Sequence, residues 1–161
     1  KYKNKFIDIN VVETLSASLK SNNHFEIVKL NYYNSLNEKK NSFIKGENFK
    51  ICCEINISNT KINKFSILLT ISDGNNNEIS GTKTEMKDIN KGTYIFEFIE
   101  DKIRYNWGDY FISLHIFSGH NCITEFNRIS RISFINKMIK EEVHYGGYLL
   151  NQMKTKINQV E

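Results

Sequence analysis

The stretch that decides the fold is Phe49-Lys-Ile-Cys-Cys-Glu-Ile-Asn-Ile57, in which apolar and polar side chains alternate. A period of two places successive side chains on opposite faces of a strand, so one face of this segment is expected to be buried. The same period recurs along the chain at Phe25–Tyr32, Phe65–Ile71, Ile79–Thr84, Tyr94–Phe98, Tyr110–Phe117, Ile123–Phe126 and Ile129–Ile135. Polar turns separate these segments, which predicts an all-β chain, an antiparallel β-sandwich of about seven to nine strands.

Three details refine this prediction. The sequence Trp107-Gly-Asp-Tyr110 places a Gly-x-Tyr at the start of a strand, which resembles the tyrosine corner of immunoglobulin-like sandwiches. We therefore expect the Tyr110 phenol to bond back to the chain. Asn34–Gly46 is interpreted as a polar connection, and the segments Ile123–Phe126 and Ile129–Ile135 as the last hairpin of the core.

The two ends of the chain have a different character. Residues 1–23 carry a helix-like apolar stripe and end in polar residues, so we interpret them as a short N-terminal arm or linker from an upstream domain. Residues 24–161 are expected to form the sandwich, with a terminal strand or tail beginning at Gly146–Leu150. Because the sequence begins at Lys1, we interpret it as part of a longer protein.

Composition excludes several classes of protein. The chain has 161 residues, of which 40% are hydrophobic and 25% charged, which fits one globular domain. It contains no proline, and no apolar stretch is long enough for a transmembrane helix. The net charge of +4 comes from scattered lysines, with only three arginines, so we predict a solvated surface and no nucleic-acid partner. Three cysteines, two of them adjacent, exclude a disulfide framework and fit a reducing compartment.

The sequence contains no complete catalytic or metal-binding motif. The glycines Gly74 and Gly81 lie too far apart for a phosphate-binding loop. His115, His120 and Cys122 lie close together across a hairpin, but a fourth ligand is not evident, so we interpret them as exposed turn residues. The chain has no Gly-x-Ser-x-Gly elbow. These observations predict a domain that is not an enzyme and needs no cofactor or metal.

With catalytic motifs excluded, the sequence favours a binding surface. On the strand Tyr110–Phe117 the odd-numbered residues should face outward, beside Thr70 of one neighbouring strand and Arg131 of another. Aromatic rings, a histidine, an arginine and hydroxyls together suit sugar recognition. We predict a ligand-binding set of Thr70, Trp107, His115, Phe117 and Arg131. The alternative is that the arm, a dimer mate or the C-terminal strand covers these residues.

The order of several short motifs resembles a known family. Lys45-Gly-Glu47 is followed by a strand ending in Asp73-Gly74, then by Ser80-Gly-Thr-Lys-Thr84, Gly92-Thr-Tyr94, Gly108-Asp-Tyr110, a late strand at Arg131-Ile-Ser-Phe134 and Gly146-Gly147. Over about residues 25–150 the chain is similar to the C-terminal domain of the ATP-binding subunits of Wzt-type O-antigen polysaccharide exporters. Its segment Tyr105-Asn-Trp107 replaces a proline-containing turn of that family.

The resemblance implies an immunoglobulin-like domain that binds the non-reducing end of a cytoplasmic polysaccharide and couples its completion to export. It also implies a homodimer that exchanges its last strand, here Val143–Leu150. The partners would be an upstream ATPase domain and a permease, with the protein in the cytoplasm at the inner membrane. The alternative is an immunoglobulin-like adhesion or protein-binding module without a sugar ligand.

Overall fold

The computed structural model describes residues 24–135 and 153–160, and every named element in these ranges is a β-strand. The strands, in chain order, are β1 (Phe25–Asn34), β2 (Ser42–Ile44), β3 (Phe49–Ser72), β4 (Glu78–Lys83), β5 (Lys87–Glu100), β6 (Gly108–Ser118), β7 (Asn121–Ile135) and β8 (Lys154–Gln159). The predicted all-β sandwich is confirmed. In the described ranges, no helix has the length and apolar character needed to cross a membrane.

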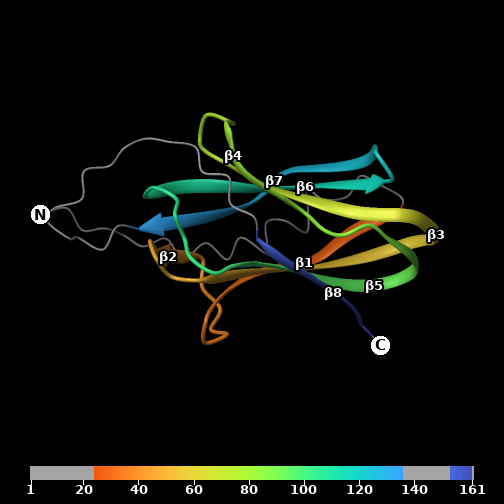
Figure 1. Cartoon of the computed structure of the whole chain (residues 1–161), viewed down its shortest axis with the longest axis horizontal. Coiled ribbons are helices and arrows are strands. Elements are labelled where there is room, and N and C mark those ends of the chain that lie inside the picture. The colour runs from red at the N-terminus through yellow and green to blue at the C-terminus, as the bar shows by residue number, and fades with distance from the viewer. Residues whose placement is uncertain (1–23, 136–152, 161) are drawn as a thin grey trace, which may run out of the picture.

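β3 connects the two layers of the sandwich (Figure 1). Its first half pairs with β1 and β5, and β8 lies beyond β5. Its second half pairs with β4 and β6, and β7 lies beyond β6. The sequence predicted two separate strands here, and that was wrong. The chain stays extended through residues 58–64, where shifts in register let one strand serve both layers.

Two further expectations are corrected. Ile123–Phe126 and Ile129–Ile135 do not form a hairpin, because both lie in β7, which pairs along its length with β6. A bulge near Arg128, whose φ is +50°, interrupts the alternation and makes one strand resemble two. The connection Asn34–Gly46 contains β2, which pairs in parallel with Ser133–Ile135, whereas the other ladders among the described residues are antiparallel.

Some predictions fall outside the described residues. They are the arm at 1–23, the tail at Gly146–Leu150 and the exchanged strand at Val143–Leu150. The sequence did not predict β8, in which Ile157 is the single apolar residue and packs against the core. In the structure β8 pairs antiparallel with β5 of the same chain, from Lys154 opposite Ile99 to Gln159 opposite Tyr94.

The core lies between the layers and is built from the inward positions of the alternating strands. The inward residues of β3 from Phe49 to Ile57 are at most 1% exposed. At one end, aromatic rings from four elements meet around Phe134 of β7. Its ring centroid lies 5.7 Å from that of Phe49, 4.9 Å from that of Tyr105 and 5.3 Å from that of Tyr110. This cluster closes the end of the sandwich where β6 begins.

Two tyrosine corners bond back to the chain, one within β5 and one at the start of β6. The Tyr110 hydroxyl donates to the carbonyl of Asn106 at 3.1 Å, which confirms the predicted corner. The Tyr94 hydroxyl makes the same bond to the carbonyl of Asn90, four residues back, at 3.0 Å. Both sites share the sequence Asn-x-Gly-x-Tyr, and Gly92 and Gly108 have φ values of +154° and +144° that favour glycine. The motif is thus used twice in this fold.

Removal of either corner hydrogen bond is expected to lower stability by a similar amount. Tyr94→Phe and Tyr110→Phe should each lower the free energy of unfolding by about 0.5–1.5 kcal/mol, because each removes one partly buried hydrogen bond to a backbone carbonyl. Urea unfolding with an unchanged m-value measures this. Tyr33→Phe, on a half-exposed ring, is the control and should change stability less. Equal losses in all three variants would contradict the role of the corners.

A buried carboxyl near the aromatic cluster makes stability depend on pH. Glu100 is buried and accepts a hydrogen bond from the Tyr105 hydroxyl at 3.2 Å. Burial raises the pKa of Glu100, and this outweighs the hydrogen bond of Tyr105 and the charge of Arg104, which act in the opposite direction. A raised pKa means that the folded state holds the proton more tightly than the unfolded state does. Stability from this group is therefore present at low pH and lost as pH rises through the folded pKa.

Replacement of Glu100 by glutamine removes the loss of stability that ionisation of this carboxyl causes at neutral pH. We expect Glu100→Gln to be more stable than the parent at about pH 7 and to lose this advantage near pH 4, where the parent carboxyl is protonated. Thermal unfolding at both pH values measures the difference. Glu85→Gln, on an exposed side chain, is the control. An advantage of the same size at both pH values would show that the effect does not come from ionisation.

Candidate functional site

Four of the five predicted site residues lie on one outer face, formed by β3, β6 and β7. Phe117 pairs with Ser66, and Thr70 with Ser113. Arg131 pairs with Phe111, which lies two residues before Ser113 in β6. The predicted outward direction of this face is confirmed by the register, while the inward residues of β6 are buried. The role of these residues in binding stays a prediction.

Side chains on this outer face are largely engaged with one another. The Lys83 ammonium lies over the Phe117 ring, 4.0 Å from its centroid. The Arg131 guanidinium lies 3.7 Å from the Asp109 carboxylate. Thr70 is only 3% exposed. A ligand that used the Phe117 ring or the Arg131 guanidinium would have to displace these contacts.

Trp107, the fifth predicted residue, lies away from the others. It is 65% exposed and stands just before β6, beside Gly108, which pairs with Phe134. His115 is eight residues further along, which corresponds to about 26 Å of extended strand. The structure therefore does not bring Trp107 together with His115.

The opposite layer carries an open groove that the sequence did not reveal. It has a volume of about 340 Å³ and lies on the outer face of β1, β3 and β5. Its lining consists of Lys29, Asn31, Tyr33, Asn37, Lys50, Cys52, Glu54, Ile95 and Glu97. Strand register arranges most of them in rows: Tyr33 opposite Lys50, Asn31 opposite Cys52 and Glu97, and Lys29 opposite Glu54 and Ile95.

A bulge in β1 is the reason that this set forms. Phe25 and Ile27 point into the core at odd positions, whereas Leu30 and Tyr32 do so at even positions. The register shifts between Ile27 and Lys29, so the residues that follow turn over. A bulge of this kind cannot be read from the alternation of one strand. The available signal was the row of outward polar residues on Phe49–Ile57, which looks like an ordinary solvated face.

Lys50 is the centre of the polar network in the groove. Its ammonium lies 3.2 Å from the Glu97 carboxylate and donates to the Asn37 side-chain oxygen at 3.2 Å. It also lies over the Tyr33 ring, 5.4 Å from the centroid. Burial lowers the pKa of Lys50, but the hydrogen bond and charge of Glu97 outweigh it and raise the pKa above its ordinary value. Lys50 is therefore a fixed positive charge in the groove at neutral pH.

Asn31 and Cys52 form the floor of the groove beside this network. Asn31 is only 4% exposed, and its side-chain oxygen has no hydrogen-bond partner. A buried acceptor without a partner is costly, and such atoms in native proteins call for an explanation such as a bound ligand. The Cys52 thiol donates to Glu97 at 3.5 Å, and burial raises its pKa to about 11, so it stays protonated. The groove thus has fixed charges at its surface and, in its floor, a buried acceptor without a partner.

Comparison with known proteins identifies the family. The Wzt C-terminal domain family matches residues 16–145. This chain belongs to the Wzt C-terminal domain family. The family is associated with polysaccharide ABC transporters, and its domain is a C-terminal one rather than a catalytic one. The predicted membership is therefore confirmed.

One of the similar solved structures shares the fold. The crystal structure of the C-terminal domain of Wzt has 13% sequence identity and a TM-score of 0.60, covering 76% of this chain and 84% of that chain. The CARDB domain of a Pyrococcus furiosus protein also has 13% identity, and covers 71% of this chain and 95% of that chain, but its TM-score is 0.42, too low to define a common fold. No curated protein matches the chain.

Proposed function

We propose that this Wzt C-terminal domain binds the non-reducing end of a cytoplasmic O-antigen-type polysaccharide in the groove of β1, β3 and β5. Membership of a family associated with polysaccharide transporters supports the ligand class. The observation that carries the location is the open groove itself, where the Lys50–Glu97 ion pair lies beside Asn31, a buried residue whose side-chain oxygen has no hydrogen-bond partner.

The groove has the chemistry that a sugar requires. Sugar hydroxyls donate to carboxylates, which Glu97 and Glu54 supply. They accept from ammonium groups, which Lys50 and Lys29 supply. Polar groups of both kinds fixed beside an apolar surface are typical of small-ligand sites. The groove holds about 340 Å³, which is room for the end of a polymer rather than for a long stretch of it.

Under this proposal, the domain acts together with the other subunits and domains of a polysaccharide transporter. Polymer binding in the cytoplasm reports that the chain is complete, and an upstream ATPase domain with a membrane permease at the inner membrane then exports it. A homodimer that exchanges the strand Val143–Leu150 belongs to the same proposal, and that segment lies outside the described residues. The domain itself recognises the polymer and performs no chemistry on it.

Calorimetric titration with the organism's own polysaccharide tests the proposal. We expect saturable binding, and competition by short fragments from the non-reducing end but not by fragments from the reducing end. Circular dichroism establishes that the protein used is folded. A folded domain that does not bind the native polymer would overturn the proposal, and equal competition by both kinds of fragment would overturn the specificity for the non-reducing end.

A further inference from the structure

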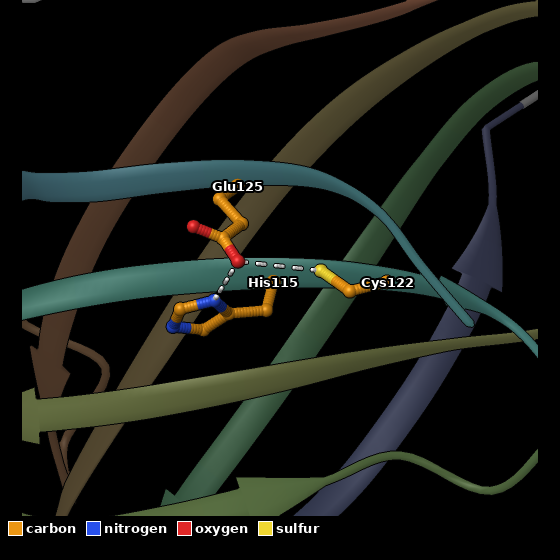
Figure 2. A group of neighbouring side chains, drawn as sticks. All are labelled: His115, Cys122 and Glu125. Carbon is orange, nitrogen blue, oxygen red and sulfur yellow. Dashed lines mark hydrogen bonds and ion pairs between the residues drawn. The ribbon is translucent and has the colours of Figure 1, made fainter. Parts of the chain in front are cut away.

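Three metal-ligating side chains meet on the outer face of β6 and β7, away from the groove (Figure 2). His115 comes from β6, and Cys122 and Glu125 come from β7. One donor atom from each residue lies within 4.8 Å of the others. The Glu125 oxygen is 3.9 Å from the His115 Nδ1 and 3.8 Å from the Cys122 sulfur. The three side chains therefore converge on one point.

A bulge in the hairpin produces this convergence. Cys122 and Glu125 are three residues apart, and in a regular strand an odd spacing would turn them to opposite faces. The register shifts between Ile116 and Phe117, so that Cys122 pairs with Phe117 while Glu125 pairs with His115. Both residues therefore face outward beside His115. Bulges commonly re-aim side chains in this way next to functional sites.

We propose that His115, Cys122 and Glu125 form a binding site for a divalent transition metal of the zinc type. Imidazole, thiolate and carboxylate are all ligands of zinc, and around a tetrahedral ion such donors stand roughly 3.3 to 3.8 Å apart. The distances to Glu125 are close to this range, so small side-chain rotations complete the geometry. Three protein ligands leave one coordination position open to water or to a ligand's oxygen.

The sequence analysis interpreted His115, His120 and Cys122 as exposed turn residues, which is wrong for His115, because it lies half-buried within β6. Among the described residues, Glu125 and not His120 accompanies His115 and Cys122. A carboxylate is the better third ligand here, because its negative charge offsets part of the charge of the ion. Lys83, whose ammonium packs over the Phe117 ring, is a positive charge near Cys122 on this face.

Titration of the reduced domain with Co²⁺, followed by absorption spectroscopy, tests the site. We expect about one Co²⁺ per chain, with a thiolate-to-metal charge-transfer band and tetrahedral d–d bands, and displacement of Co²⁺ by Zn²⁺. Cys122→Ser should abolish the charge-transfer band. His115→Ala and Glu125→Gln should weaken binding at least about tenfold, the effect seen when even an outer partner of a metal ligand is lost.

His120→Ala and Cys52→Ser are the matched controls, since they remove the same donor types outside the cluster, and both should leave the spectra unchanged. Absence of a thiolate band in the parent domain would overturn the proposal. Persistence of that band in Cys122→Ser, or its loss in Cys52→Ser, would also overturn it. Polymer binding is not part of this readout, so the metal site and the proposed function succeed or fail separately.

Discussion

Phe134→Ala is expected to lower the free energy of unfolding by about 3–5 kcal/mol. Phe134 is almost fully buried, and its ring contacts Phe49 of β3, Tyr105 of the β5–β6 connection and Tyr110 of β6. Truncation removes its buried surface and leaves a cavity at the end of the sandwich. Because domains of this size are stable by only about 5–15 kcal/mol, the variant should lose a large share of its stability.

Phe117→Ala is the matched control for this prediction. Phe117 lies on the outer face of β6, half-buried under Lys83. The same truncation there should cost only about 1–2 kcal/mol, from partial burial and one cation–π contact. Urea unfolding of both variants measures the difference. If the two phenylalanines cost the same, the assignment of inner and outer faces in the β6 layer would be wrong.

Lys50→Met should weaken polysaccharide binding by roughly ten- to hundredfold, which corresponds to the loss of about 1.5–3 kcal/mol for a hydrogen bond to a charged group. Lys50 holds Glu97 and Asn37 through its ammonium and packs over Tyr33. Methionine keeps most of the length of the side chain and removes the charge. The polar groups around it would then lose the partner that fixes their geometry in the groove.

Control variants show which face of the domain binds the polysaccharide. Lys87→Met removes an exposed lysine at the start of β5 and should leave binding unchanged. His115→Ala and Phe117→Ala test the face that the sequence favoured, and they should also leave binding unchanged if the polymer occupies the groove. Loss of binding in these two variants, with full binding by Lys50→Met, would place the polymer on the β6 face and reject the groove.

Local patterns predicted much of the fold. Alternation located β1, β4 and β6 closely, and the Gly-x-Tyr before β6 predicted the corner at Tyr110. The errors in the predicted strands arose where pairing between strands overrides the local alternation of apolar and polar residues. Residues 58–64 look like a loop because their alternation fails, yet they stay extended within β3, where Lys61 and Ile62 pair with β5. β2 is three residues long and is fixed by its parallel neighbour β7.

The candidate sites were harder to predict for the same reason. The groove depends on the bulge after Ile27, which turns Asn31 outward, and the metal site depends on the bulge that brings Cys122 and Glu125 to one face. A bulge is set by the register between two strands, so the sequence of one strand does not reveal it. The sequence showed His115 and Cys122 close together across a hairpin but predicted no metal site, because the third donor, Glu125, is added only by the register.

Backbone amide NMR of the labelled domain, titrated with a short fragment from the non-reducing end of the polysaccharide, tests the central claim most directly. The account predicts that the largest chemical-shift changes occur on β1, β3 and β5, at Asn31, Cys52 and Glu97, with little change around His115. Shifts confined to β6 and β7 around His115 and Phe117, with none at Asn31, would contradict it.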